Sequence, residues 1–205
     1  MSLYQLIRIV LAVVIAAIPF LLLRRVLQTK ARIIVSVVCL VVVNVALCHV
    51  PFENAFMSFP TPEEAARYAY EKGICIVEGE RSGLMLLEES AADHRVQILP
   101  KEDGKWKLSG EGGTHFRRVY TNDTATVVLL QYKETEEFYI YVHCDTVSVS
   151  VSDSLGSDFW GYENDLISEY YAYIPQFDDT YTLTIDGTTI ALTEDSPHLV
   201  KGLFS

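Results

Sequence analysis

Apolar and polar positions divide the chain into two unlike parts. Residues 3–23 and 33–50 are long apolar runs, and no Asp or Glu occurs before residue 51. A helix rises about 1.5 Å per residue and a bilayer core is about 30 Å thick, so about 20 apolar residues cross it. The pattern therefore predicts two transmembrane helices at the start of the chain.

A basic loop over residues 24–32 separates the two runs and sets the expected orientation. Its four basic residues are Arg24, Arg25, Lys30 and Arg32. Lys and Arg concentrate in cytoplasmic loops. We therefore expect a two-pass hairpin over residues 1–50 in the cell membrane, with this loop inside and the C-terminal domain extracytoplasmic.

A cleaved signal peptide is the main alternative to this hairpin. Cleavage requires small residues at the exit of the apolar segment. Instead, Arg24 and Arg25 follow the first run, and Leu47 lies near the exit of the second. These residues favour two uncleaved spans.

Four residues within the spans bear on how the helices pack. Arg8 lies about one turn inside the first run, where its long side chain is expected to reach the lipid headgroups. Ala12 and Ala16 form a small-xxx-small pair, and Asn44 offers an interhelical hydrogen bond worth about 0.6 kcal/mol. Neither span contains an acidic residue, so we expect no ion or proton transport by this chain alone.

After a connector at residues 51–60, the pattern predicts one helix and then many strands. Thr61 suits the helix cap, Pro62 the first helical position and Gly73 the end. From Gly73 onward the apolar positions alternate, as in strands with one buried face. The expected strands are residues 74–78, 84–88, 95–99, 105–108, 116–121, 124–132, 138–144, 180–185 and 188–192.

Two of these segments carry further information. Residues 125–130 are apolar on both faces, which is typical of a central strand. Val147, Val149 and Val151 alternate with serines, which predicts a strand with one wet face. We therefore predict that residues 61–205 form a mostly-β (α+β) domain with one N-terminal helix and sandwich-like antiparallel sheets.

One stretch resembles a known group of proteins. The helix opening Pro62-Glu63-Glu64 is followed by the segments Ile74-Cys75-Ile76-Val77-Glu78-Gly79, Ile98-Leu99-Pro100-Lys101 and Gly104-Lys105-Trp106-Lys107. Over residues 60–108 this looks like uncharacterised membrane-anchored proteins of Gram-positive bacteria. The resemblance implies a bacterial cell-envelope setting and supplies neither an activity nor site residues.

Charge and cysteine content narrow the possible partners. All 27 acidic residues follow residue 50, so the second part of the chain is strongly acidic and is expected to repel nucleic acid.

The four cysteines fall into two pairs by location. Cys39 and Cys48 lie in the second apolar run. Cys75 and Cys144 lie in predicted strands, where an extracytoplasmic setting permits either a disulfide or two buried thiols.

An aromatic segment at residues 159–181 is the best candidate for a binding surface. Ile, Leu and Val in the earlier strands already supply a core, so exposed aromatic side chains here would indicate contact with a ligand or partner. The alternative is a packed crossover segment that closes the sheet. We expect at least two of five residues to be exposed on one side: Trp160, Tyr162, Tyr170, Tyr171 and Tyr173.

Catalytic and metal-binding patterns do not stand out. The five histidines are scattered without H-x-x-x-H or H-E-x-x-H spacing, and no G-x-S-x-G occurs. Residues 153–158 do not follow the ligand order of an EF-hand loop. His143 alternates with Tyr139 and Tyr141, which favours a hydrogen-bonded packing role. We expect no catalytic residues, no metal site and no cofactor.

These observations favour a membrane-anchored extracytoplasmic protein that binds an envelope glycan, a peptide or a membrane-protein partner. An accessory or sensory subunit of a larger membrane complex is the second hypothesis. A surface hydrolase is the third, and it requires a polar cleft that the sequence does not reveal.

Overall fold

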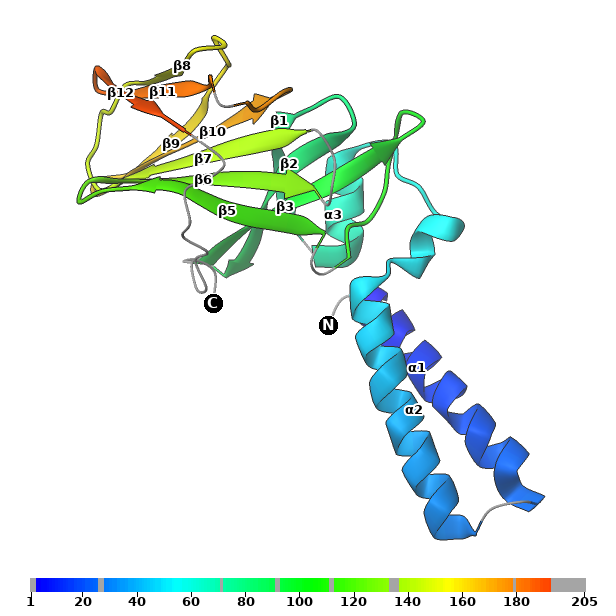
Figure 1. Cartoon of the computed structure of the whole chain (residues 1–205). Coiled ribbons are helices and arrows are strands. Elements are labelled where there is room, and N and C mark those ends of the chain that lie inside the picture. The colour runs from blue at the N-terminus through cyan, green and yellow to red at the C-terminus, as the bar shows by residue number, and fades with distance from the viewer. Residues whose placement is uncertain are drawn as a thin grey trace.

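The computed structural model describes residues 3–25, 28–70, 72–90, 93–110, 113–132, 137–178 and 180–192. Two long antiparallel helices project from one end of a domain built mainly of antiparallel strands (Figure 1). The α+β character predicted for the chain is therefore confirmed.

The projecting helices are α1 (Leu3–Leu22) and α2 (Thr29–His49), and a short turn of helix, η1 (Leu23–Arg25), follows α1. Both are long and apolar enough to span a membrane. α2 begins four residues earlier than the apolar pattern predicted, because the polar residues before Ile33 also adopt helical conformation. Ala12 and Ala16 are buried, 1% and 7% exposed, where the two helices pack together, as their spacing predicted.

Arg8 and Asn44 do not act as predicted. Arg8 is 9% exposed and forms an ion pair with Glu53 of the connector. Its charge is therefore paired within the protein, whereas the sequence predicted that it reaches the lipid headgroups. The Asn44 amide donates to the Leu40 carbonyl of its own helix at 2.9 Å and remains exposed. A side chain can bond the carbonyl four residues back without leaving its helix, so this contact does not join the two spans.

The connector contains η2 (Phe52–Ala55) and leads into α3 (Pro62–Tyr70). The Thr61 hydroxyl accepts from the Glu64 amide at 3.3 Å, which confirms the predicted helix cap. Ala65 and Ala66 are fully buried. These small side chains allow α3 to lie close against the strands that follow.

In the part of the domain that the structure describes, the strands form three antiparallel sheets. The first has the order β1-β2-β3-β4, the second β5-β6-β7-β10-β9 and the third β12-β11-β8. The strands are β1 (Gly73–Glu78), β2 (Ser82–Ser90), β3 (Asp93–Glu102), β4 (Lys105–Trp106), β5 (Thr114–Thr121), β6 (Ala125–Tyr132), β7 (Phe138–Cys144), β8 (Val151–Asp153), β9 (Trp160–Glu163), β10 (Ser168–Ile174), β11 (Thr182–Ile185) and β12 (Thr188–Ala191).

Turn chemistry fixes two hairpins, each between strands that the sequence predicted. Asp103 and Gly104 have φ values of 51° and 72°, and Asp186 and Gly187 have values of 47° and 75°. Two successive residues with positive φ are what a tight hairpin turn requires, and Asp-Gly tolerates this conformation best. The register of β3 with β4 and of β11 with β12 follows from these turns.

The five-stranded sheet is the centre of the domain, because side chains on both its faces are buried. Val127 and Leu129 of β6 pack in one cluster with residues of β11, such as Leu183. Val128 and Leu130 pack in another cluster that includes residues of β2 and β3. β6 is therefore the central strand that its two apolar faces predicted.

The strand predicted around Val147, Val149 and Val151 is shorter than expected. β8 covers Val151–Asp153 alone, and Val147 is 43% exposed. Ser148 has a φ of 59°, a conformation that interrupts an extended strand. The alternation of valine and serine therefore does not produce a continuous strand.

Candidate functional site

One face of the five-stranded sheet collects aromatic and titratable side chains from β7, β9 and β10. Residues directly opposite in antiparallel strands point to the same face. Tyr141 pairs with Tyr171, which pairs with Trp160; one step along, His143 pairs with Glu169, which pairs with Tyr162. We call the first three the covered row and the second three the open row.

The covered row belongs to the core. Tyr141 and Tyr171 are 5% and 4% exposed, and their rings stack with centroids 4.9 Å apart. The Trp160 ring lies 5.9 Å from that of Tyr171. Tyr141 and Tyr171 share their cluster with Leu84 and Ile98 of the four-stranded sheet, and Trp160 packs against it. Burial on this scale makes these rings packing elements.

The open row is accessible to solvent. The side chains of His143 and Glu169 are 27% and 21% exposed, and Tyr162 is 43% exposed. Asp145 follows the end of β7, and its side chain is 63% exposed. An aromatic ring, an imidazole and two carboxylates therefore meet at one place on the surface.

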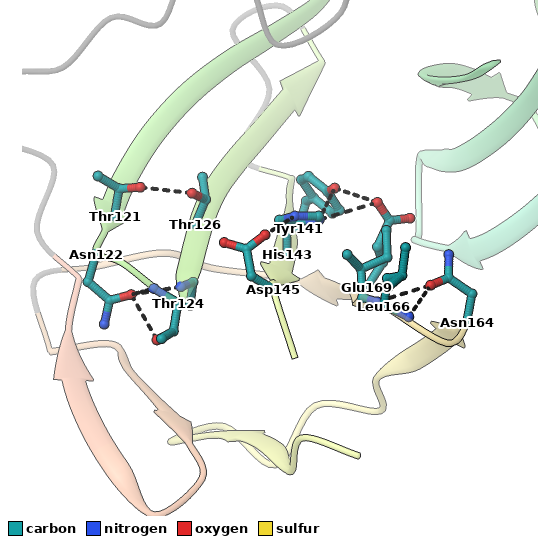
Figure 2. Close-up of polar contacts among 12 residues, drawn as sticks. Thr121, Asn122, Thr124, Thr126, Tyr141, His143, Asp145, Asn164, Leu166 and Glu169 are labelled. Carbon is teal, nitrogen blue, oxygen red and sulfur yellow. Dashed lines mark hydrogen bonds and ion pairs between the residues drawn. The ribbon is translucent and has the colours of Figure 1, made fainter. Parts of the chain in front are cut away.

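Hydrogen bonds hold the Glu169 carboxylate in place (Figure 2). The Tyr141 hydroxyl donates to Oε1 at 2.7 Å and the Tyr171 hydroxyl to Oε2 at 3.3 Å. His143 Nδ1 lies 3.6 Å from Oε1, and Nε2 lies 3.2 Å from Asp145 Oδ1. The imidazole is thus held between two carboxylates.

This arrangement shifts the titration of both partners. Hydrogen bonding to Glu169, opposed by partial burial and assisted by Asp145, raises the pKa of His143 above its usual value. Burial acts to raise the pKa of Glu169, but hydrogen bonds from His143 and Tyr141 outweigh it and lower this pKa. The pair therefore stabilises an imidazolium beside a carboxylate and extends the pH range over which His143 is charged to higher pH.

Two asparagine-capped turns lie on either side of His143 and Glu169 (Figure 2). Asn122 Oδ1 accepts from the amides of Thr124 and Ala125 at 3.0 and 2.7 Å, between β5 and β6. Asn164 Oδ1 accepts from the amides of Leu166 and Ile167 at 2.9 and 3.0 Å, between β9 and β10. Side-chain capping of this kind fixes a turn without a regular hydrogen-bond ladder.

The structure separates the five aromatic candidates predicted from the sequence. Trp160, Tyr162, Tyr171 and Tyr173 share one face, whereas Tyr170 lies on the other, where its hydroxyl donates to the Val149 carbonyl at 2.5 Å. Tyr162 is exposed, Tyr171 is buried and the other three are partly buried. The expectation of at least two well-exposed rings is therefore not met, because most of these rings complete the core.

Tyr173 takes part in a buried polar network at the opposite end of this face. Its hydroxyl donates to Glu137 Oε1 at 3.1 Å, and burial raises the pKa of Tyr173 to about 12. Glu137 also accepts from the Arg81 amide at 2.7 Å and from the Ser82 hydroxyl at 2.5 Å. The Ser82 hydroxyl lies 2.9 Å from that of Tyr139. This carboxylate, 6% exposed, ties the β1–β2 turn to β7 and β10.

A concavity lies beside β1. It has a volume of about 590 Å³ and is lined by residues that include Glu63, Cys75, Glu78, Lys101 and Trp106. Glu63 Oε1 accepts from the Cys75 amide at 3.3 Å, and Lys101 pairs with Glu78 at 2.6 Å. Burial, assisted by these carboxylates, raises the pKa of the Cys75 thiol to about 12. The thiol is therefore a poor nucleophile.

The cysteines of the domain are free. Cys75 and Cys144 are both thiols, in β1 of the first sheet and β7 of the second. Of the two alternatives left open by the sequence, the structure has separate thiols and no bridge between them.

The polar groups of the open row already contact one another and their neighbours. The ring nitrogens of His143 contact Tyr141, Asp145 and Glu169. Burial raises the pKa of Tyr141, so its phenolate is disfavoured as a nucleophile. Among the residues that the structure describes, no three His, Cys, Asp or Glu side chains are placed to hold a metal ion.

Sequence reasoning missed the pairing of His143 with Glu169, which lie 26 positions apart in the sequence, in β7 and β10. The only local signal was the alternation of His143 with two tyrosines. Comparison with known proteins adds no further guide, because no protein-family model, curated protein or solved structure matches the chain.

Proposed function

We propose that the chain is a two-pass membrane protein that presents its β-rich, sandwich-like domain outside the cytoplasm to bind an envelope ligand. The observation that carries this proposal is the outward-facing apolar surface of the hairpin. Many apolar side chains of α1 and α2 are about half exposed or more, among them Val13, Leu21, Ile34 and Val42. Full burial of one such side chain is worth about 1.5–3 kcal/mol, so immersing both helices in lipid gains on the order of tens of kcal/mol.

The orientation follows from charge. The hairpin turn carries Arg24 and Arg25, and Lys30 and Arg32 lie in the first turn of α2. Basic residues at one end of a hairpin favour the cytoplasmic side. The acidic domain at the other end then lies in the extracytoplasmic space.

The open row is the proposed ligand-binding face. The exposed Tyr162 ring offers a flat apolar surface for stacking, and the exposed Asp145 carboxylate, held by the His143 ring, offers an acceptor on the same face. This combination suits a hydroxyl-rich ligand such as an envelope glycan. A peptide ligand is the competing outcome of the test below.

Binding can be measured with the full chain in detergent micelles, using soluble cell-wall oligosaccharides and, separately, the matching stem peptides as probes. Tyr162→Ala and His143→Gln should each weaken oligosaccharide binding about tenfold. Phe116→Ala is the matched control, because Phe116 is equally exposed, at 43%, but lies on β5. Unchanged oligosaccharide binding in both site variants, or binding of the peptides alone, would contradict the proposal.

An accessory role in a membrane complex is the second candidate, and Asn44 favours it. Its amide is exposed on α2, at a depth where the hairpin is otherwise apolar. A polar group in lipid is stabilised by hydrogen bonding to another transmembrane helix. If this role is correct, Asn44→Leu should abolish co-purification of a membrane-protein partner while leaving the oligosaccharide measurement unchanged.

A further inference from the structure

A buried ion pair lies where the hairpin meets the domain. Arg8 of α1 and Glu53 of η2 are 9% and 1% exposed. Arg8 Nε lies 3.0 Å from Glu53 Oε1, and Arg8 Nη2 lies 2.9 Å from Oε2. This parallel, two-point contact is the most directional ion pair that side chains form. It joins residues 45 positions apart in the sequence.

Other groups converge on the same guanidinium. The carbon at the centre of this group lies 4.1 Å from the Tyr4 ring centroid and 5.6 Å from that of Phe52. Arg8 Nη1 donates to the Leu47 carbonyl in the last turn of α2. A single side chain therefore holds together the start of α1, the end of α2 and the connector.

Aromatic contacts continue from this point into the domain. The Tyr4 ring meets Tyr68 of α3 edge-on, with centroids 5.7 Å apart, and Tyr68 packs on Phe59 at 5.5 Å. Burial and the neighbouring Glu53 raise the pKa of Tyr68, with Arg8 acting in the opposite direction. The first turns of α1 are thus packed against the helix that covers the first sheet.

The connector is attached to the domain as well. The Asn54 side chain accepts from the Leu108 amide and donates to the Leu108 carbonyl, both at 2.8 Å. The backbone at Gly110 approaches the His49 carbonyl so closely that a Cβ at residue 110 would collide with it. Only glycine fits between the end of α2 and the domain at this point.

We propose that the Arg8–Glu53 pair is a clamp that locks the domain to the hairpin, so that the two move as one body. A ten-residue connector would otherwise act as a flexible tether. Removing one partner leaves the other charge buried and unpaired, which strongly favours opening of the junction. Together with the proposed membrane anchoring, the clamp holds the open row at a fixed height and angle above the bilayer. A rigid connection of this kind would pass a force on the domain directly to the membrane helices.

Distance measurements between the two parts test the clamp. Spin labels are placed at Gln28, at the tip of the hairpin, and at Thr189, on β12, in a chain without native cysteines. Pulsed electron paramagnetic resonance in micelles then gives the distribution of distances. The wild-type chain should give one narrow distribution, and Arg8→Gln and Glu53→Gln should each broaden it at least twofold. The double variant should be no broader than either single variant, because the two residues act as a unit.

Matched controls separate the clamp from general effects of charge removal. Arg25→Gln and Glu64→Gln remove one exposed charge each from the hairpin and from α3, and should leave the distribution narrow. Circular dichroism confirms that each variant keeps its folded domain, and Arg8→Lys supplies a milder variant if Arg8→Gln does not fold. A broad wild-type distribution would overturn the clamp, as would single variants as narrow as wild type.

Flotation with liposomes measures membrane anchoring separately, so that a failure of anchoring can be told apart from a failure of the clamp. A chain that floats with the liposomes but shows broad distances contradicts the clamp alone. A chain with narrow distances that fails to float contradicts anchoring alone.

Discussion

Replacing Glu137 with alanine tests the account of the domain core. Glu137 is 6% exposed and accepts hydrogen bonds from the Arg81 amide, the Ser82 hydroxyl and the Tyr173 hydroxyl. Alanine removes all three acceptor contacts at once. The variant should weaken the connection between the first and second sheets.

The size of the effect follows from which donors lose their partner. Ser82 keeps Tyr139 at 2.9 Å, so the Arg81 amide and the Tyr173 hydroxyl are the two donors left without Glu137. A hydrogen bond to a charged group contributes about 1.5–3 kcal/mol. The expected loss is therefore about 3–6 kcal/mol, which at about 2–4 °C per kcal/mol for a domain of this size lowers the melting temperature by about 6–24 °C. Glu137→Gln should cost about 1–2 kcal/mol, because its oxygen still accepts and its amide can donate to Ser82.

Chemical denaturation of the full chain in micelles, followed by tyrosine and tryptophan fluorescence, measures both losses. Glu102→Ala provides the control, because Glu102 is exposed and a change there should stay within about 0.5 kcal/mol. If alanine and glutamine at residue 137 cost the same small amount as this control, the carboxylate does not organise the core and the reasoning is wrong.

Three further results are expected. The stability that wild type gains over His143→Gln should be full between about pH 4.5 and 6.5. It should fade as pH rises through the raised pKa of His143, and it should be lost as pH falls below about 4.5 through the lowered pKa of Glu169. Denaturation at about pH 3, 6 and 8 should show about 1 kcal/mol at pH 6 and less at both other values. Because Cys75 and Cys144 are free, a reducing agent should leave the melting temperature unchanged, and a shift of several degrees would indicate a bridge. Tyr171→Ala should destabilise the domain by about 3–5 kcal/mol, whereas Tyr162→Ala should cost less than about 1 kcal/mol in the same melts; equal losses would contradict their assigned burial.

Local patterns were enough to predict most of the secondary structure. The helix at α3 was marked by Thr61 and Pro62, and two hairpins were marked by Asp-Gly pairs, because these residues act through their own backbone conformation. The central position of β6 was visible because apolar side chains on both faces need cover on both sides. Such features depend on neighbouring residues alone.

The site could not be predicted in the same way, because it depends on strand order. Glu169 meets His143 only because β10 lies beside β7, and nothing near either residue indicates that pairing. The aromatic segment was misjudged for a related reason. The sequence suggested that Tyr171 was not needed for the core. In the structure, the first sheet packs against that part of the face and buries Tyr171.

Arg8 shows the same limit within the hairpin. Its position near the end of an apolar run agrees with a side chain that reaches the headgroups, and the run itself gives no sign of an acidic partner. Glu53 lies beyond α2, and it becomes a neighbour of Arg8 only when the hairpin closes. Pairs of this kind follow from tertiary structure.

The orientation of the domain is the central claim, and thiol accessibility in intact cells tests it most directly. Single cysteines are introduced at Thr189 in the domain and at Thr29 in the hairpin turn, in a chain whose four native cysteines are replaced. A membrane-impermeant thiol reagent should label residue 189 in intact cells and residue 29 only after lysis. Labelling of residue 29 in intact cells, with residue 189 protected until lysis, would contradict an extracytoplasmic domain.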